Sequence, residues 1–418
     1  MNTQATDAIP AERPIISKQL GFFRGFRKKT GWYLEYLWHL TESLRACRCN
    51  AIWLEGEERI TGETVRVFYF GHGENYEFIL KRIYAEYRTI SIKKNILAFN
   101  IKKWVRKSTE GVDLIFCDVA LLYTLMLPRE EYLEIPHWIR QRYTVPDTWE
   151  AVLQSFRKNT RKTDLRKVRK YKFSYTISTA EEDYKSFYHT MHVPYLRKRF
   201  DDLVIIEPEW KFLRQCRKGH LMQIIRDGEV VAAVLLHMAD GRLAYVWVGV
   251  PENIEGDMFN GAFSALYYYT ILHGYMNGCH EIDFLGTRPV LNDGLFRYKR
   301  KWGTHVQTSP VPRGDMLLKP LRLSAPVKRF FANTFFITKD KKNNKLNGKI
   351  LVDSHQVTKD DIQELINNYR TDGLNKLYIY FCDGFNANQS QWIESNFSDV
   401  KLVDLALISN PADGFCRA

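Results

Sequence analysis

The sequence lacks long apolar runs. No window approaches the roughly 18 consecutive apolar residues of a membrane-spanning helix, and the opening residues, Met1 to Pro14, are polar and without the apolar core of a secretory signal. Cysteine is scarce as well: there are seven, an odd number spread from Cys47 to Cys416, which favours reduced thiols over a disulfide framework. These absences predict a cytoplasmic protein.

Several catalytic signatures are also missing. The sequence contains no Gly-x-Ser-x-Gly nucleophile turn, no Walker phosphate loop, no dinucleotide-binding fingerprint and no His-Glu-x-x-His zinc motif. Cys47 and Cys49 form the one close cysteine pair, and structural zinc normally needs four ligands. We therefore expect no metal site and none of the enzyme classes that these motifs mark.

What the sequence does contain is an ordinary globular composition with an excess of positive charge. Its 418 residues are 45% hydrophobic and 26% charged, and at roughly 150 residues per domain they predict two or three domains. Lys and Arg number 61 against 48 Asp and Glu, a net charge of +13. Such a surface favours an anionic partner, such as an acyl-coenzyme A, an aminoacyl-tRNA, a nucleotide-linked precursor or an anionic membrane.

The distribution of polar and apolar residues divides the chain into four parts. We expect an N-terminal α/β unit at 1–135, a second domain at 136–312, a polar linker at 313–348 and a small C-terminal α/β module at 349–418. Within the first part, Leu20 to Trp38 combines a basic cluster with aromatic residues at helical spacing. This segment either contacts an anionic membrane surface or packs its apolar face on its own domain.

A run of cations opens the second domain. Arg157 to Lys172 holds nine Lys or Arg and one acid, a density that repels itself unless an anion is near. The run is either a solvated helix face or a phosphate or carboxylate contact. Both alternatives stay open here.

The rest of the second domain alternates strands and helices. Asp227-Gly228 is a strong hairpin signal, and with the turn at Asp240-Gly241 it predicts three consecutive antiparallel strands from Leu221 to Val250. A long apolar helix, Asn260 to Tyr275, a strand, His280 to Leu285, and a short basic helix, Asp293 to Trp302, follow. The fold class expected is α/β (α+β), with a mixed sheet and flanking helices.

The end of this domain resembles a known family. Glu281-Ile-Asp283-Phe-Leu-Gly286-Thr-Arg288-Pro, followed by Asp293-Gly-Leu-Phe-Arg297-Tyr298-Lys299-Arg300-Lys301-Trp-Gly303, is similar to the end of the GNAT-like domain of FemAB and BioF2-like (CelD-type) acyltransferases. Pro194 to Phe200, with Tyr195 and Arg199, resembles the opening half of that domain. The first part of the chain is loosely similar to a degenerate GNAT half.

The resemblance implies transfer of an acyl or aminoacyl group onto an amine. Such chemistry needs a proton acceptor, oxyanion donors and cations for the donor's phosphates. We predict Asp283 as the catalytic carboxylate, in a groove between the strand ending at Val250 and the strand 280–285. The alternative for Asp283 is a structural ion pair with Arg288 or Arg297.

Substrate-binding residues are expected from the same segments: Tyr195, Arg199, Arg288, Arg297, Tyr298, Lys299 and Lys301. The family resemblance places a Lys of the short helix on a phosphate, which we carry over to Lys299.

One departure affects the cofactor. Glu255 to Ala262 keeps only Gly261-Ala262 of the glycine-rich loop that binds coenzyme A pyrophosphate in other GNAT enzymes, and acids surround it. Gly261 is the expected cofactor contact. The donor, acyl-CoA or aminoacyl-tRNA, is left open.

The sequence thus predicts an N-acyltransferase that acts on a cell-envelope or small-molecule acceptor. Its expected location is the cytoplasm or the surface of a membrane. The alternatives are an aminoacyl-tRNA-dependent peptide-bridge transferase and a non-catalytic GNAT-like binding module.

Overall fold

The computed structural model describes residues 47–73, 75–200, 206–309, 315–353, 357–385 and 387–417, and they fall into two compact units. We call Arg140–Leu285 with Tyr298–His305 the central unit. The flanking unit comprises the described residues of Leu20–Ile139, Gly286–Arg297 and Val306–Ala418. The basic aromatic segment Leu20 to Trp38 lies outside the described residues.

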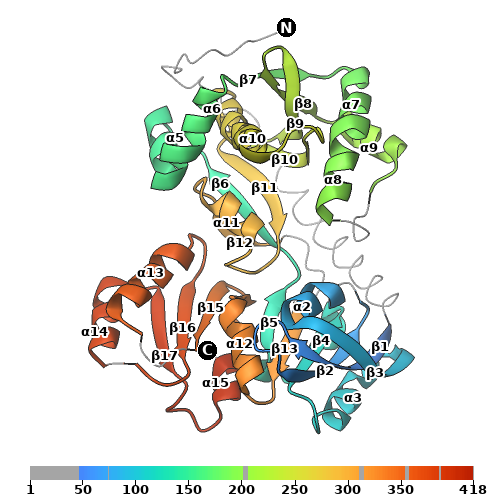
Figure 1. Ribbon diagram of the computed structural model, residues 1–418, viewed down its shortest axis with the longest axis vertical. Helices are drawn as coiled ribbons and strands as arrows, with labels where there is room; N and C mark the ends of the chain where they lie inside the picture. Colours follow the sequence, from blue (N-terminus) through green and yellow to red (C-terminus); the bar gives the residue numbers. More distant parts are fainter. Residues whose placement is uncertain are drawn as a thin grey trace, which may run out of the picture. The chain divides into compact units, whose positions relative to one another are not determined.

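The central unit is built on part of a mixed seven-stranded sheet of order β12-β6-β11-β10-β9-β8-β7, of which it holds the strands from β6 to β7 (Figure 1). Its strands are β6 (Ile139–Thr144), β7 (Ser174–Ser178), β8 (His220–Arg226), β9 (Glu229–Ala239), β10 (Arg242–Gly249) and β11 (Glu281–Thr287). Its helices and π-helical turns are α5 (Trp149–Ser155), η3 (Thr160–Asp164), α6 (Leu165–Lys170), α7 (Glu181–Phe187), η4 (Tyr188–His192), α8 (Val193–Phe200), α9 (Glu209–Cys216), α10 (Gly256–Met276) and the end of α11 (Gly294–Arg300).

The three-strand meander is confirmed. Strand β8 pairs antiparallel with β9, and β9 pairs antiparallel with β10. Both turns have positive φ at their two central residues, +50° and +85° at Asp227-Gly228 and +51° and +70° at Asp240-Gly241. Only Gly, Asn and Asp adopt this conformation readily, and its twist matches that of the flanking strands.

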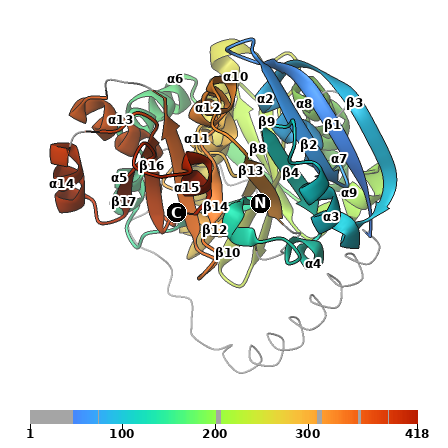
Figure 2. The ribbon, with the colours of Figure 1, turned by 90° about the horizontal axis from the view of Figure 1, so that it is seen from below.

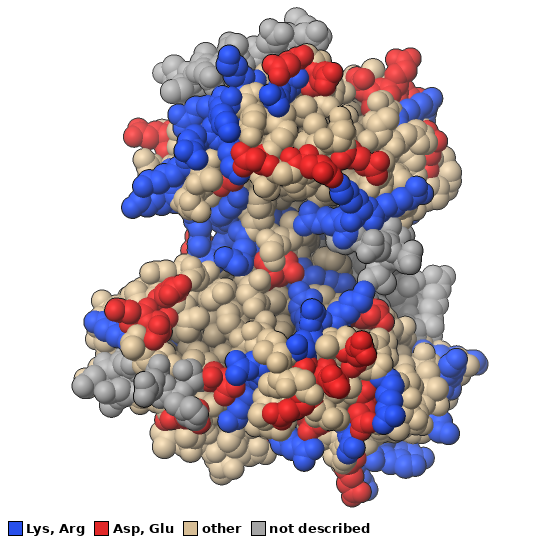
Figure 3. Space-filling model, viewed as in Figure 1, with Lys and Arg blue, Asp and Glu red and all other residues tan. Residues whose placement is uncertain are grey.

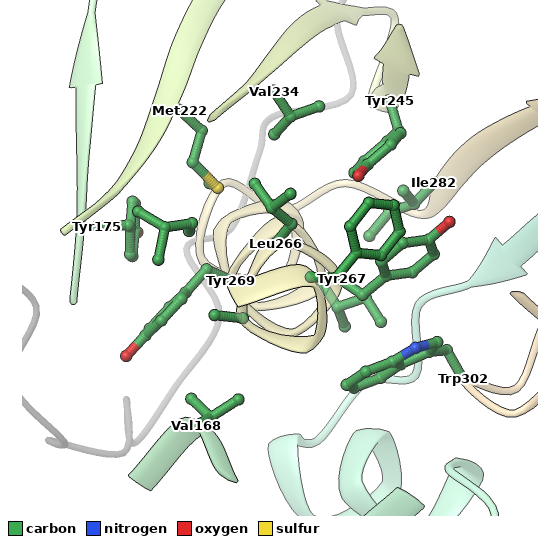
Figure 4. Packing of buried hydrophobic residues seen from close by; sticks show 14 of the residues in the cluster. Val168, Tyr175, Met222, Val234, Tyr245, Leu266, Tyr267, Tyr269, Ile282 and Trp302 are labelled. Atoms are coloured by element: carbon green, nitrogen blue, oxygen red, sulfur yellow. The ribbon is translucent and has the colours of Figure 1, made fainter. Parts of the chain in front are cut away.

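Helix α10 runs through the core of this unit. Figure 4 looks along it: Leu266 extends toward Met222 and Val234 of the sheet, Tyr267 toward Tyr245, and Val168 of α6 lies below. Because sheet and helix cover α10 from different sides, its sequence is apolar nearly all round rather than amphipathic. The other face of the meander is covered by α7, η4 and α9, whose Phe187 and Phe212 pack on Leu221 and Leu235.

The flanking unit holds two further sheets. The first has the order β3-β1-β2-β4-β13-β5, and β3, β1, β2 and β4 run side by side in Figure 2. Its elements are β1 (Arg48–Glu58), β2 (Thr64–Gly71), α2 (Tyr76–Ile83), β3 (Tyr84–Leu97), η1 (Ala98–Asn100), α3 (Ile101–Lys107), β4 (Leu114–Val119), α4 (Leu121–Thr124), η2 (Arg129–Glu131), β5 (Leu133–Pro136) and β13 (Asp315–Pro320).

The second sheet has the order β14-β15-β16-β17, with β15, β16 and β17 parallel. Its elements are α12 (Ala325–Asn333), β14 (Ile337–Lys339), β15 (Leu346–Val352), α13 (Lys359–Tyr369), β16 (Lys376–Phe381), α14 (Ala387–Asn396), β17 (Val400–Asp404) and α15 (Pro411–Arg417); β12 (His305–Thr308) precedes this part of the chain.

The structure differs from the expected linker at 313–348. Strand β13 lies between β4 and β5 and pairs antiparallel with both, so this segment completes the sheet that the N-terminal residues began. Met316, Leu317 and Leu318 are fully buried there. A six-residue strand between polar stretches is too short to show a periodicity, and only its partners identify it. The boundaries expected at 135, 312 and 348 shift accordingly.

No helix within the described ranges is both long enough and apolar enough to cross a membrane.

Candidate functional site

The sheet of the central unit opens between β10 and β11. These parallel strands pair only where Arg242–Ala244 lies beside Glu281–Asp283. Beyond this point β10 carries a bulge at Val246, where its register with β9 shifts, and Leu285 of β11 has a left-handed φ of +60°. Bulges of this kind redirect strands next to active sites. The two strands therefore diverge at the groove where the sequence placed the active site.

Aromatic rings line the opening on the side of α10. Tyr267 of α10 stacks on Phe284 of β11, with centroids 4.8 Å apart and planes 10° apart. Its ring lies 5.1 Å from Tyr245 of β10, 5.1 Å from Tyr298 of α11 and 5.8 Å from Trp302. Three phenol groups thus meet at the point where the strands part.

The Tyr245 hydroxyl differs from most buried polar groups in its hydrogen bonding. It is buried and has no hydrogen-bond partner among the described residues. Burial, reinforced by the neighbouring Tyr267 and Tyr195, raises the pKa of Tyr245 well above its ordinary value. The group is therefore a protonated donor without an acceptor. Buried polar groups in native proteins are almost always paired, so an exception calls for an explanation, and a catalytic role is one.

A polar network lies beside the phenols. Lys301 Nζ is 2.8 Å from Asp164 Oδ1, at the end of the π-helical turn η3, and 3.9 Å from the centre of the Tyr298 ring. Ser264 Oγ donates to the same carboxylate at 2.9 Å and lies 3.3 Å from Tyr298 Oη. Burial lowers the pKa of Lys301, and Asp164 opposes that shift. The predicted phosphate ligand Lys301 is therefore already ion-paired inside the domain.

Helix α8 contributes the next two predicted residues. The Arg199 guanidinium donates to Tyr195 Oη and lies 5.7 Å from the centre of that ring. The Tyr195 ring stacks on Phe259 of α10, with centroids 6.4 Å apart. Both Tyr195 and Arg199 act electrostatically on Tyr245 and Tyr267. Tyr195 and Arg199 thus lie close to Tyr245 and Tyr267, and Tyr298 packs on Tyr267.

Asp283 lies on the opposite face of β11. Ile282 and Phe284 point toward α10, so the residues between and beside them point away. Asp283 Oδ2 is 3.1 Å from Arg140 Nη1 and 3.4 Å from Arg142 Nε, and Oδ1 accepts the Leu285 N–H at 2.8 Å. The geometry favours the structural alternative for Asp283, with two arginines of β6 as partners instead of Arg288 or Arg297.

Replacing Asp283 with Asn distinguishes these two roles. We expect Asp283→Asn to lower the free energy of unfolding by about 1 to 3 kcal/mol, because the partly buried Arg140 loses its carboxylate partner and Arg142 keeps only Glu281. Transfer activity of the folded fraction should change by less than about threefold. Thermal unfolding and an acyl-transfer assay check this. A catalytic carboxylate would give the reverse: activity lost at an unchanged melting temperature.

The cations predicted around the short helix α11 do not form one group. Lys299 is buried, and its Nζ donates to the Phe284 carbonyl at 2.6 Å. This bond joins α11 to β11 at the opening. Arg297 is exposed.

Arg288 belongs to the flanking unit. Its Nη1 donates to Asn75 Oδ1 at 2.6 Å, and its guanidinium lies 4.4 Å from the Phe78 ring and 4.2 Å from the Trp138 ring. Asn75 in turn donates to the buried Asp118 carboxylate. Arg288 therefore anchors the segment after β11 within that unit.

Gly261, the predicted cofactor contact, faces protein. A Cβ at this position would lie 2.9 Å from the ring of Tyr171 and 3.2 Å from that of Phe173, so the glycine lets α10 approach these rings. At the start of α10, Asp257 is 2.5 Å from Lys167 Nζ and accepts the Tyr171 hydroxyl at 2.8 Å. Carboxylates thus already occupy the helix end where a pyrophosphate would bind.

The basic run is a surface of the central unit. Lys and Arg side chains gather over α5 and α6 in Figure 3, and Lys158, Lys162 and Arg166 are exposed. No described carboxylate lies within ion-pair distance of these three. Lys167 and Lys170, by contrast, face Asp257.

The sequence analysis did not single out two residues, Tyr245 on the α10 side of β10 and His192 on the other face of the sheet. Tyr245 sits in an apolar strand pattern that gives no sign of an unpaired hydroxyl. His192 ends the π-helical turn η4 and is buried; its Nδ1 lies 2.9 Å from the Val248 carbonyl, which can only accept. The proton is therefore on Nδ1, and Nε2 carries a lone pair. Burial lowers the pKa of His192 below its ordinary value.

No group of three or more His, Cys, Asp or Glu side chains within the described ranges is arranged to hold a metal ion.

Comparisons with known proteins bear on this site. Residues 154–300 match the acetyltransferase (GNAT) domain family. None of the curated proteins searched matches the chain.

Solved structures with some likeness include FemX and L-PGS. FemX is 12% identical, with 65% of this chain and 84% of that chain covered and a TM-score of 0.35. L-PGS from Bacillus licheniformis is 13% identical, with 65% and 85% covered and a TM-score of 0.32.

A third is described as a probable N-acyltransferase from Enterococcus faecalis. It is 10% identical, with 76% of this chain and 71% of that chain covered and a TM-score of 0.27. TM-scores this low do not establish a common overall architecture.

The family match covers the basic run, the meander, α10, the diverging strands and α11. The resemblance to the GNAT superfamily that the sequence predicted is therefore confirmed over residues 154–300.

Proposed function

We propose that this protein is an N-acyltransferase that moves an acyl or aminoacyl group from a phosphorylated donor onto an amine. The observation that carries the proposal is the buried, unpartnered hydroxyl of Tyr245 at the point where β10 and β11 diverge. A donor carbonyl entering the opening would supply the acceptor that this hydroxyl lacks. It would also meet backbone N–H groups of β10 that no described strand pairs on this side.

The reaction balances with the groups present. The acceptor nitrogen attacks the carbonyl, a C–N bond forms, and the C–S bond of a thioester or the C–O bond of an ester breaks. Tyr245 stabilises the developing oxyanion, and Tyr298 supplies the proton that the leaving sulfur or oxygen takes up. The pKa of each is raised, first by burial, so both are protonated at neutral pH.

His192 is the proposed proton acceptor for the amine. Its lowered pKa keeps the imidazole neutral at pH 7, and the Val248 carbonyl fixes the tautomer that leaves Nε2 free to accept. Val248 lies on β10 beyond the bulge. His192 packs on Phe212 on the face of the sheet opposite Tyr245, so the amine would reach it past the edge of β10 that β11 leaves unpaired beyond Ala244.

Residues at the start of α10 and on the basic run bear on the identity of the donor. The acids at the start of α10 and the packing of Gly261 disfavour the usual coenzyme A cradle. The exposed cations Lys158, Lys162 and Arg166 offer an alternative contact for phosphates, which favours an aminoacyl-tRNA as the second candidate donor. A cell-envelope amine, reached at the membrane surface, is the proposed acceptor class.

A donor comparison tests this proposal. The full chain is incubated with acetyl-CoA or with charged tRNA and a panel of amines, and products are identified by mass spectrometry. Changing Lys158, Lys162 and Arg166 together to Gln should weaken tRNA binding by about tenfold or more at low salt and less at high salt. The triple change Lys93, Lys94 and Lys102 to Gln, which alters exposed cations of the flanking unit, is the matched control. Equal binding by both variants at every salt concentration would exclude the tRNA donor.

A non-catalytic binding module is the remaining alternative. It predicts ligand binding without product with either donor, and no effect of losing the Tyr245 hydroxyl on turnover.

A further inference from the structure

The flanking unit contains a pocket whose lining residues all follow the GNAT-like segment in the sequence. Its volume is about 330 Å³, and it lies where β16 and β17 end. Leu321 and Leu323 come from the chain after β13, Lys328 from α12, Cys382 from the end of β16 and Leu405 from the end of β17. None of these residues belongs to the site described above.

The position is one at which α/β sheets bind ligands. Strands β15, β16 and β17 are parallel, so their carboxyl ends share one edge. Ligands of open parallel sheets bind outside this edge, where the connecting loops leave a crevice. Here α12 and the turn before α15 supply the remaining walls.

Size and lining limit what can bind. A cavity of about 150 Å³ in another protein holds a benzene molecule, so this pocket has room for a ring with a short side chain. Its walls are mostly apolar, through Leu321, Leu323, Leu405 and Ala412. An apolar body of this size is therefore expected.

Two cations line the pocket, Arg322 and Lys328. Arg322 is partly engaged, since its Nε lies 2.6 Å from Asp113 Oδ1. Among the residues described, no carboxylate is within ion-pair distance of Lys328 Nζ. Burial raises the pKa of Cys382 to about 11; of the charges acting on that thiol Lys328 has the largest effect, ahead of Asp353 and Asp383. The ammonium group of Lys328 therefore acts on the pocket wall.

We propose that this pocket binds a small carboxylate with an apolar body, the carboxylate beside Lys328 and the body against Leu321, Leu323 and Leu405. The site is separate from acyl transfer and does not depend on the proposed function. Because the chain after β13 and the second sheet both form its walls, a bound ligand would stabilise the flanking unit.

Cys382 provides a readout that is independent of activity. It is one of two half-buried cysteines among the described residues, and the other, Cys47, does not line the pocket. The full chain is alkylated with N-ethylmaleimide, and the rate at each cysteine is followed by peptide mass spectrometry. The probes are phenylpropionate, phenylpropanol and phenylpropylamine, which share a body and differ in charge.

We expect saturating phenylpropionate to slow alkylation of Cys382 by about fivefold or more while Cys47 is unaffected. Phenylpropanol should bind about tenfold more weakly, and phenylpropylamine should not protect. Lys328→Met should remove the preference for the acid, whereas Lys342→Met, at an exposed lysine of a turn, should keep it.

Two results would overturn the proposal. Unchanged alkylation of Cys382 at millimolar phenylpropionate would show that the pocket does not take this class of ligand. Equal protection by the acid, the alcohol and the amine would show that Lys328 does not select charge. Ala412→Leu, which fills the pocket, should abolish protection; should that variant not fold, the comparison of Lys328→Met with Lys342→Met still decides.

Discussion

Replacing Tyr245 with Phe should reduce the turnover number by about 10² to 10³ without destabilising the protein. A hydrogen-bond donor aimed at a developing oxyanion contributes this much to a rate. The stability should hold or rise, because the change removes a buried hydroxyl with no partner among the described residues and keeps the ring against Tyr267 and Phe284. Steady-state kinetics and thermal unfolding measure the two effects.

The matched control is Tyr175→Phe. Tyr175 is a buried tyrosine of the same core cluster on β7, where it packs on Tyr269. Its loss should leave turnover within about twofold. A Tyr245→Phe variant with full turnover would remove the catalytic role of this hydroxyl and support the binding-module alternative. A large loss of stability would mean that the hydroxyl has a structural partner.

The second large effect is a pH dependence of stability caused by Lys349 on β15. This lysine is 3% exposed, and its Nζ donates to Tyr380 Oη at 2.9 Å and to the Phe415 carbonyl at 2.7 Å. Burial lowers its pKa from 10.5 to about 7, and the nearby Cys416 opposes this shift. The folded state thus holds a neutral amine where the unfolded chain binds a proton.

The direction of the effect follows from that difference. Below pH 10.5 the unfolded state binds more protons than the folded state, so stability falls as pH decreases, and the loss is complete near pH 7. Between pH 9.5 and pH 7 the wild type should lose about 3 kcal/mol more than Lys349→Met, at about 1.4 kcal/mol per pH unit.

Denaturant unfolding at both pH values measures this difference. The buried Cys416 thiol, whose pKa is raised to about 11, stays protonated in the fold over this pH range, so its contribution is nearly the same in both proteins. Parallel pH profiles for the two proteins would mean that Lys349 stays protonated in the fold.

Much of the central unit could be predicted from the sequence, because the patterns that specify its turns, helix starts and strand faces involve residues a few positions apart. The Asp-Gly turns specify their hairpins through positive φ at two adjacent residues. Thr148 accepts the Ala151 N–H and Asp293 accepts the N–H groups of Leu295 and Phe296, so residues next to each helix cap its start. Alternation along β11 puts Ile282 and Phe284 on one face and Asp283 on the other.

The sequence could propose candidate residues for the site but not their surroundings. Tyr195, Arg199 and Tyr298 lie near Tyr267, and their role in substrate binding stays a prediction. The sequence could not say which guanidinium groups meet Asp283, since Arg140 and Arg142 are more than a hundred residues away. It also could not show that the Lys299 ammonium group donates a hydrogen bond to the Phe284 backbone carbonyl.

The sequence by itself determined the elements of the GNAT domain, its turns and the face on which each strand residue lies, because these depend on neighbours a few positions away. The tertiary structure alone decided that β13 completes the first sheet, that the Tyr245 hydroxyl has no partner among the described residues and that burial lowers the pKa of Lys349. Each of these depends on burial and on partners from distant segments, and neither quantity is present in a local pattern.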